Sequence, residues 1–420
     1  MKLLVHNIGC LVTPEGREAH AGSAQGKVKK LENAYVCIEN GLIEETGTGM
    51  PSDNAWQTCL RLDAQGHLVT PGLVDAHTHL VFGGWRAHEL DLKLAGVPYL
   101  DILAAGGGIL STVRATRAAS QEALVEKAAG LLEEMLAMGV TTCEAKSGYG
   151  LCLADELKQL QAIRALQTRQ RVELIPTLMA AHAVPEEYLG RSNDYVRLIE
   201  NEIIPAVAEA GLAKFCDVFC ETGVFDVAQS RRVLRAGQKH GLRAKIHADE
   251  IDVLGGTALA REVDAISAEH LIATREQGIA ELAESRAVAC LLPATSFYLK
   301  KNYAWARQMI DAGIPVAVAS DFNPGSCPGL SLPFAMNLAC YQYGLRPEEV
   351  LTAVTLNAAA AVGMAETLGS LEAGKQADLV VWNAGDLPYI LYRFGSNLAG
   401  TVVKRGKIVY SSQTNEVYKL

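Results

Sequence analysis

Short apolar segments alternate with longer amphipathic ones through the middle of the chain. Runs of β-branched and apolar residues, punctuated by glycine, predict strands, and apolar positions three and four apart predict helices. The predicted strands span residues 73–79, 139–146, 172–181, 214–221, 243–249, 265–271, 287–293 and 315–321. Helical spacing dominates between them, for example over 120–139 and 227–241. Eight strands that alternate with helices predict an α/β fold, a (β/α)₈ TIM barrel, with a doubly wound open sheet as the alternative.

The two ends of the chain follow a different pattern. Residues 1–70 contain short strand-like segments separated by turns, and so do residues 365–420. Neither end is large enough to bury a core of its own comfortably. We therefore expect residues 1–70 and 365–420 to pair into one small composite β-sandwich beside a barrel domain of residues 71–364.

Composition narrows the classes of function. The 420 residues carry a net charge of −9, which argues against a nucleic-acid partner, and contain no apolar stretch long enough to span a membrane. The first residues, "MKLLVHNIGC", lack the features of a signal peptide. Ten cysteines scattered through apolar segments are typical of reduced thiols, so we expect a cytoplasmic protein. The oligomeric state stays open, with a homodimer as one option.

Residues with metal-binding chemistry collect where the predicted strands end. In "VDAHTH", His77 and His79 are one residue apart, so a strand places both on the same face. His247 ends the fifth predicted strand, His270 the sixth and Asp321 the eighth. Because the carboxyl ends of barrel strands meet at one mouth, we expect these side chains to converge there.

The expected centre is a single divalent metal ion held by His77, His79, His247 and Asp321. One histidine near a strand end is usually a hydrogen-bonded structural residue, but four ligands from three strands favour a metal. Three nitrogens and one carboxylate suit Zn²⁺ first and Fe²⁺ or Mn²⁺ next. Such an open site activates water for hydrolysis, and Asp321 is expected to take the proton of that water as well.

Two further groups are expected to move or hold protons. Glu250 follows His247 by three residues, where its carboxylate can reach a substrate N–H or a histidine. We expect Glu250 to orient His270, and His270 to transfer a proton to or from the attacking water. A structural salt bridge at the barrel mouth is the alternative. Glu221 and His270 could also hold a second ion.

The order of these residues resembles the amidohydrolase superfamily, whose fold joins a metal-bearing (β/α)₈ barrel to a small β-sandwich made from both termini. The resemblance covers nearly the whole chain. It rests on H-x-H in the first strand, histidines in the fifth and sixth, and aspartate in the eighth. Finer motifs are similar to those of the amidohydrolases of histidine degradation, which open the ring of 4-imidazolone-5-propanoate with water to give N-formimidoyl-L-glutamate. These motifs are "GGGILSTVRATRAAS", "EAKSGYGL", "IPTLMAAHAVP", "KIHADEI", "SAEHL" and "ASDFNPGSCP".

The resemblance implies roles for residues that spacing alone does not single out. It implies the same four metal ligands and one ion per chain; from the ligand chemistry we expect this ion to be zinc, with Fe²⁺ or Fe³⁺ as alternatives. The substrate would be a small molecule that carries a carboxylate, held by Arg86. The other implied substrate or product contacts are Tyr149, His182, Glu250, Asn323, Gly325 and Ser326. Without the resemblance, Arg86 would be a loop arginine and "NPGS" an ordinary turn.

Two other functions stay open at this point. A deaminase of a nucleobase-like ring would use a similar metal set, but a neutral base does not need the cation Arg86. A non-catalytic assembly protein with this fold is expected to have lost metal ligands, and none is missing from this sequence.

Overall fold

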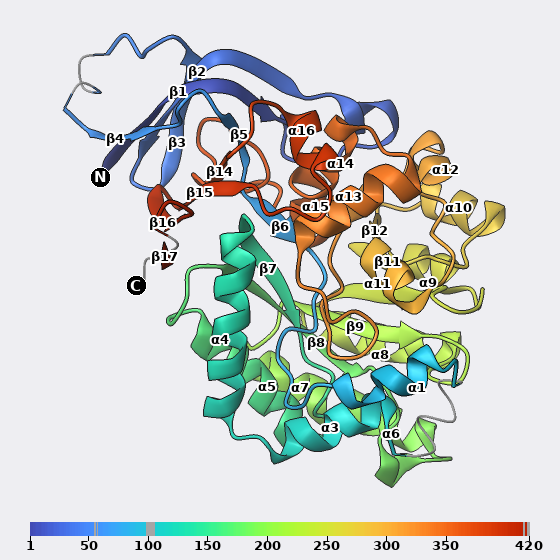
Figure 1. The fold of residues 1–420 in the computed structure, drawn as a ribbon. Coiled ribbons are helices and arrows are strands. Elements are labelled where there is room, and N and C mark those ends of the chain that lie inside the picture. The colour runs from blue at the N-terminus through green and yellow to red at the C-terminus, as the bar shows by residue number, and fades with distance from the viewer. Residues whose placement is uncertain (54–55, 57, 98–105, 415, 418–420) are drawn as a thin grey trace.

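The computed structural model describes residues 1–53, 56, 58–97, 106–414 and 416–417. Its centre is an eight-stranded parallel sheet in the order β13-β12-β11-β10-β9-β8-β7-β6, which curls into a nearly closed barrel (Figure 1). The strands are β6 (Leu73–Asp75), β7 (Val140–Lys146), β8 (Glu173–Ala181), β9 (Phe215–Cys220), β10 (Arg243–Ala248), β11 (Ser267–His270), β12 (Val288–Leu291) and β13 (Val316–Val318). Each observed strand lies within a predicted one. The barrel prediction is confirmed, and the open-sheet alternative is wrong.

The gap between the first and last barrel strands closes beside the predicted metal ligands. Thr78 and Phe322 form an isolated parallel bridge, and the backbone N–H of Asp321 donates to the carbonyl of His77 at 3.1 Å. Below this bridge, the backbone N–H and the hydroxyl of Ser320 both donate to the buried carboxylate of Asp75. The closure of the barrel therefore fixes the backbones of two predicted ligands relative to each other.

Helices cover the outside of the barrel (Figure 1). Helix α4 begins where the Ser120 hydroxyl accepts a hydrogen bond from the N–H of Ala123, and its apolar side faces the core. Helix α8 begins with a capping box between Asp226 and Gln229. The longer helices are α3 (Gly108–Ala118), α4 (Gln121–Ala137), α5 (Leu153–Leu166), α8 (Val227–Lys239), α10 (Glu276–Ala283) and α13 (Leu332–Tyr343). The shorter ones are α1 (Leu90–Leu94), α6 (Ser192–Leu198), α7 (Ile204–Glu209), α9 (Gly256–Glu262), α11 (Pro293–Leu299), α12 (Ala306–Asp311), α14 (Pro347–Ala353), α15 (Leu356–Ala361) and α16 (Leu387–Tyr392).

The two ends of the chain share one nine-stranded sheet beside the barrel (Figure 1). Its N-terminal strands are β1 (Lys2–Thr13), β2 (Lys29–Glu39), β3 (Leu42–Thr48), β4 (Leu60–Asp63) and β5 (Leu68–Pro71). Its C-terminal strands are β14 (Leu379–Trp382), β15 (Ala399–Lys404), β16 (Lys407–Ser411) and β17 (Glu416–Val417). The antiparallel pairing of β5 with β14 joins the two ends. Residues 54–55, 57, 415 and 418–420 of the expected composite domain lie outside the described residues.

A buried ion cluster ties the terminal sheet to the barrel. The ammonium of Lys404, on β15, lies 3.0 Å from Glu173 at the start of β8 and 2.7 Å from Asp378. All three side chains are mostly buried. The cluster lies at the amino ends of the barrel strands, opposite the end where the predicted metal ligands lie.

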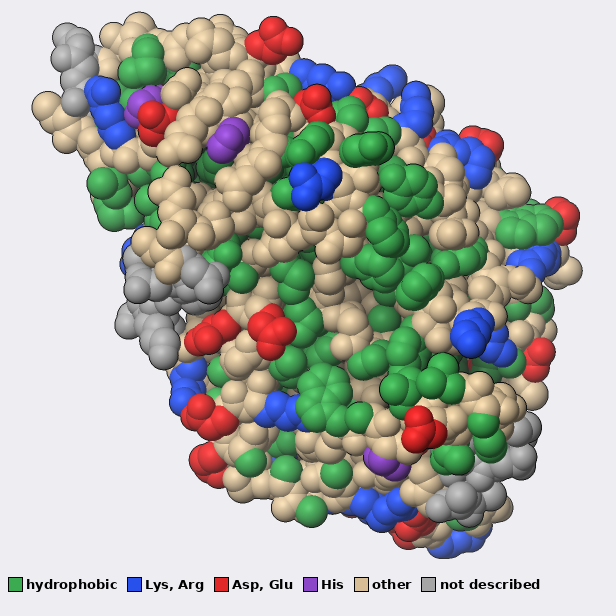
Figure 2. Space-filling view, in the orientation of Figure 1, with side chains coloured by type: hydrophobic (Ala, Val, Ile, Leu, Met, Phe, Trp, Pro, Cys, Tyr) green, Lys and Arg blue, Asp and Glu red, His purple; other side chains and the backbone are tan. Residues whose placement is uncertain are grey.

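The surface and the cysteines add little that constrains function. On the face shown in Figure 2, acidic and basic side chains are interspersed around a central area rich in hydrophobic side chains. All ten cysteines are free thiols, and Cys216 and Cys220 are both buried in β9. Among the described residues, no helix combines the length and the apolar character needed to cross a membrane.

Candidate active site

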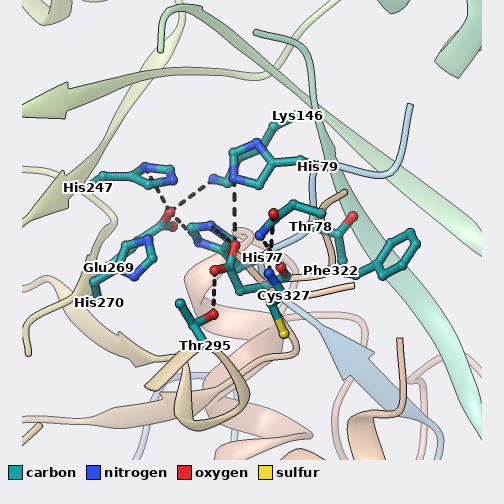
Figure 3. A network of polar contacts seen from close by, with 12 residues as sticks. His77, Thr78, His79, Lys146, His247, Glu269, His270, Thr295, Phe322 and Cys327 are labelled. Carbon is teal, nitrogen blue, oxygen red and sulfur yellow. Dashed lines mark hydrogen bonds and ion pairs between the residues drawn. The ribbon is translucent and has the colours of Figure 1, made fainter. Parts of the chain in front are cut away.

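The predicted metal ligands meet at the carboxyl end of the barrel. His77, His79 and His247 bring one potential ligand atom each within 4.8 Å of one another, and His77, Asp321 and His270 form a second such group. Figure 3 shows the four imidazoles gathered around one centre, with Glu269 between His247 and His77. Two groups that share His77 place all four predicted ligands, and His270 as well, around one point.

The distances fit a site for a cation. Oδ1 of Asp321 lies 3.4 Å from Nε2 of His77 and 3.7 Å from Nε2 of His79. The ring centroids of His77 and His247 are 4.6 Å apart, and Nε2 of His247 is buried without a hydrogen-bond partner among the described residues. A buried nitrogen without a partner costs free energy that a metal ion would recover. The donor set of three nitrogens and one carboxylate therefore fits a divalent ion.

Two carboxylates behind the ligands orient their rings. Oδ1 of Asp217 lies 3.1 Å from Nδ1 of His247, and Oε2 of Glu269 lies 2.6 Å from Nδ1 of His77. A carboxylate at Nδ1 favours the tautomer whose Nε2 lone pair is free for a metal. Thr295 orients the carboxylate ligand, Asp321, in the same way. Its hydroxyl donates to Oδ2 of Asp321 at 2.5 Å, so that Oδ1 faces the histidines.

Two buried lysines neutralise most of this acidic layer. The ammonium of Lys146 contacts Asp217 at 2.7 Å, Glu144 at 2.9 Å and Glu269 at 3.0 Å. Lys245 contacts Glu144 at 2.9 Å and Glu269 at 2.8 Å. All five side chains are fully buried. Burial alone would lower the pKa of Lys146, but the surrounding carboxylates raise it well above its usual value. The barrel interior below the histidines is thus a fixed ionic layer that we call the ionic floor.

The backbone is strained at the same end of the barrel. Asp321, His270 and Asp249 have φ angles of 54°, 70° and 51°, in the left-handed region that non-glycine residues seldom occupy. Such strain is retained where neighbouring contacts hold it, and it is common at functional sites.

The predicted pair of Glu250 and His270 lies at the rim of the centre. Oε2 of Glu250 is 3.6 Å from Nε2 of His270. Burial, with Asp321 and Glu221 nearby, raises the pKa of Glu250 to about 8. Glu221 itself accepts hydrogen bonds from the backbone N–H groups of Thr222, Ile251 and Asp252. In this structure Glu221 therefore anchors the loop that carries Glu250, and it belongs to none of the potential metal groups among the described residues.

Tyr149 and His182 form an aromatic wall beside His79. The ring of His182 stacks on that of His79 with centroids 4.8 Å apart, and Tyr149 lies 6.0 Å from His79. Nδ1 of His182 lies 3.0 Å from the carbonyl of Gly148, which fixes the imidazole in place. This wall can stack against a planar ring bound next to the metal ligands.

The loop after Asp321 leads to Arg86. The amide of Asn323 donates to the carbonyl of Asp321, and its Oδ1 accepts from the backbone N–H groups of Gly325 and Ser326. The Asn323 side chain therefore acts here as a turn organiser, which leaves its predicted substrate contact a prediction. The Arg86 guanidinium packs directly against Gly325, since a Cβ built on that glycine would lie 2.1 Å from Nη1.

The ionic floor was not predicted from the sequence, although a signal for part of it was present. Asp217, Lys245 and Glu269 are charged residues within apolar strand segments, and such residues are seldom buried unless paired. Glu269 directly precedes His270 in "SAEHL". Nothing in the sequence pattern distinguishes Thr295.

Comparisons with known proteins agree with this geometry. The amidohydrolase family model matches residues 233–420. An imidazolonepropionase of Alkaliphilus metalliredigens is 49% identical over 411 residues, which cover 97% of both chains. The imidazolonepropionase of Geobacillus kaustophilus is 48% identical, again over 97% of both chains.

The chain belongs to the imidazolonepropionase family.

Solved structures show how widely the family's fold is shared. The crystal structure of a triazine hydrolase variant superposes with a TM-score of 0.75 at 17% sequence identity. The match covers 98% of this chain and 95% of the triazine hydrolase chain. A Xaa-Pro dipeptidase matches with a TM-score of 0.71 at 15% identity, over 98% and 100%. At these identities the likeness concerns the fold alone. Family membership and the cluster of histidines and aspartate together indicate a divalent metal ion in this imidazolonepropionase-family chain.

Proposed function

We propose that this protein is a metal-dependent imidazolonepropionase, which hydrolyses the cyclic amide C–N bond of 4-imidazolone-5-propanoate to give N-formimidoyl-L-glutamate. One observation carries the proposal beyond family membership. The loop that begins at the ligand Asp321 runs to Gly325, which packs against Arg86. One loop thus connects the cluster of metal ligands to the guanidinium of Arg86. A substrate with a ring and a propionate arm requires both, the metal centre for the ring and a cation for the carboxylate.

The metal ligands in this proposal are His77, His79, His247 and Asp321. A bound divalent ion would lower the pKa of a water molecule and polarise the ring carbonyl. We assign zinc as the resident ion because of the donor set, with Fe²⁺ or Fe³⁺ as the alternatives. Metal analysis of the protein purified without added metal distinguishes these ions.

The residues of the chain bind the substrate and move the protons. Arg86 holds the propionate, and Tyr149 and His182 flank the ring. As water adds to the ring carbonyl carbon, Asp321 accepts a proton from that water. The C–N bond then breaks, and the ring nitrogen takes the proton that Asp321 gained from the water, relayed through His270, which Glu250 orients and which starts and ends neutral. The carbonyl carbon, now bonded to the hydroxyl from the water, becomes a carboxylic acid that ionises to the carboxylate. Asn323, Gly325 and Ser326 line the product side through their backbone and hydroxyl groups.

The test is turnover of freshly generated 4-imidazolone-5-propanoate, followed by loss of the ultraviolet absorbance of the ring, with the product identified by mass. We expect a product heavier than the substrate by one water. Decay at the spontaneous rate, together with ammonia release from an aminated purine, would instead favour the deaminase.

The proposed reaction requires no binding partner other than the small-molecule substrate. The ten free thiols support a reducing compartment, and we place the enzyme in the cytoplasm. We keep the division into a composite domain of residues 1–70 and 365–420 and a catalytic domain of residues 71–364.

A further inference from the structure

We propose that Glu89 and Lys93 complete a carboxylate-binding subsite with Arg86. In this subsite Glu89 is a positioning residue that aims the guanidinium, and Lys93 supplies a second positive charge to the substrate carboxylate. The inference rests on the proposed function.

Glu89 holds two cations with one oxygen atom. Its Oε2 lies 3.1 Å from Nε of Arg86 and 3.3 Å from Nζ of Lys93, and the Glu89 side chain is fully buried. Its other oxygen accepts a hydrogen bond from the backbone N–H of Gly108 at 2.6 Å, so both oxygens are occupied. Burial opposes ionisation of Glu89, but Arg86 and the Gly108 N–H lower its pKa below the usual value. The carboxylate is therefore charged and fixed.

The contact at Nε leaves the end of the guanidinium free. The side chain of Arg86 is only 8% exposed, yet Nη1 and Nη2 form no hydrogen bond with any described residue. A buried arginine whose Nε is paired and whose two terminal nitrogens are not is set up for end-on, bidentate binding of a carboxylate. Because Glu89 fixes Nε, it also fixes the direction of this fork.

Lys93 ties the subsite to the loop that leaves the metal centre. Its ammonium donates to the carbonyl of Gly325 at 2.9 Å, and Gly325 is the residue on which the Arg86 guanidinium packs. Arg86, Lys93 and Glu89 together carry one net positive charge, which matches a single carboxylate. Both cations therefore contact the Asp321–Ser326 loop at the same glycine.

A purely structural role for Glu89 is the competing explanation, because its bond to Gly108 lies at the start of helix α3. Glu89→Gln separates the two roles. A glutamine oxygen can still accept from the Gly108 N–H, but its amide cannot accept from Arg86 or Lys93. The variant thus keeps the hydrogen bond to the start of helix α3 but loses the contact that orients the guanidinium of Arg86.

The experiment compares 4-imidazolone-5-propanoate with its propionamide analogue, which lacks the charge, in wild-type and E89Q enzyme of equal metal content. We expect KM for the propanoate to rise about 10- to 100-fold in E89Q with kcat changed by less than about threefold. KM for the amide should be the same in both enzymes. The inhibition constant of glutarate, a short dicarboxylate, should rise with KM. Asp91→Asn, which removes an exposed acidic charge from α1, the helix that carries Lys93, is the matched control and should leave all three values unchanged.

Each outcome decides a separate point. If E89Q raised KM equally for the propanoate and the amide, Glu89 would have a structural role and the inference would be overturned. An unchanged KM for the propanoate in E89Q would overturn it as well. If E89Q does not fold, Lys93→Met carries the test, with about a 10-fold rise in KM for the propanoate alone. An unchanged KM in that variant would contradict the role of Lys93. A wild-type enzyme that does not hydrolyse the propanoate would contradict the proposed function itself.

Discussion

Oε2 of Glu269 lies 2.6 Å from Nδ1 of His77, and both side chains are fully buried. The contact joins the ionic floor to the metal centre, because the same carboxylate also contacts Lys146 and Lys245. Outer carboxylates of this kind fix the ring orientation and raise the basicity of a metal-binding histidine.

Glu269→Gln should therefore weaken metal binding about 10- to 100-fold without changing the ligands themselves. Competition against a chromophoric chelator measures the affinity, and circular dichroism checks the fold. Glu276→Gln, an exposed glutamate in the next helix, is the control and should bind metal like the wild type. Equal affinities in E269Q and wild type would show that Glu269 does not act on the metal through His77.

Lys146→Met should destabilise the barrel. The substitution leaves Glu144, Asp217 and Glu269 buried around an apolar side chain, and breaking a buried ion pair from one side costs about 3 to 5 kcal/mol. Urea unfolding of the metal-free protein measures the loss. Lys239→Met removes an exposed lysine from the end of α8 and should cost less than about 1 kcal/mol. A similar small loss in both variants would mean that the ionic floor is not a stabilising unit.

Acid should weaken the junction between the terminal sheet and the barrel. Burial opposes ionisation of Glu173, but Lys404, Gln376 and Arg405 lower its pKa to about 2. When folding lowers the pKa of a carboxyl, its contribution to stability is complete at pH values above its pKa in the unfolded chain, which is near 4.5 for Glu173. That contribution is lost as the pH falls toward the folded-state pKa of about 2. The contribution is about 3 kcal/mol.

The free energies of unfolding of wild type and Glu173→Gln, measured from pH 6 down to pH 2.5, test this prediction. Their difference should be largest above pH 5 and shrink as the pH falls. Exposed Glu133→Gln should differ little from wild type at every pH. A difference for E173Q that does not change with pH would contradict the assignment.

Gly325→Ala should displace Arg86. A methyl group there would lie 2.1 Å from Nη1 and 2.2 Å from the guanidinium carbon, so the arginine must move. A displacement of this size is expected to reduce kcat/KM for the propanoate about 10- to 100-fold, mainly through KM. Gly329→Ala is a control on the same loop, since a Cβ there meets no atom within 4 Å. Equal kinetics in the two variants would show that Arg86 does not hold the substrate.

The barrel could be predicted because the alternation of strand and helix patterns and the positions of the histidines at predicted strand ends indicate the same fold. Each of the eight strands lies within a predicted segment, and the histidines that follow strand ends converge because a parallel barrel brings all carboxyl ends to one mouth. The sequence pattern does not predict which carboxylates orient the metal-binding histidines. Whether Asp217 faces His247 depends on the register between the neighbouring strands β9 and β10, which no single segment reveals. Whether Glu269 faces His77 depends on packing across the barrel interior, because β11 does not pair with β6. The pairing of Glu89 with Arg86 depends likewise on the fold of one loop.

Metal stoichiometry tests the central claim most directly. Elemental analysis of wild type and of the His247→Ala and Asp321→Ala variants, each dialysed after exposure to Zn²⁺, should find one ion per chain in the wild type and about none in either variant. Two ions per chain in the wild type, or one ion retained in both variants, would contradict a single centre held by His77, His79, His247 and Asp321.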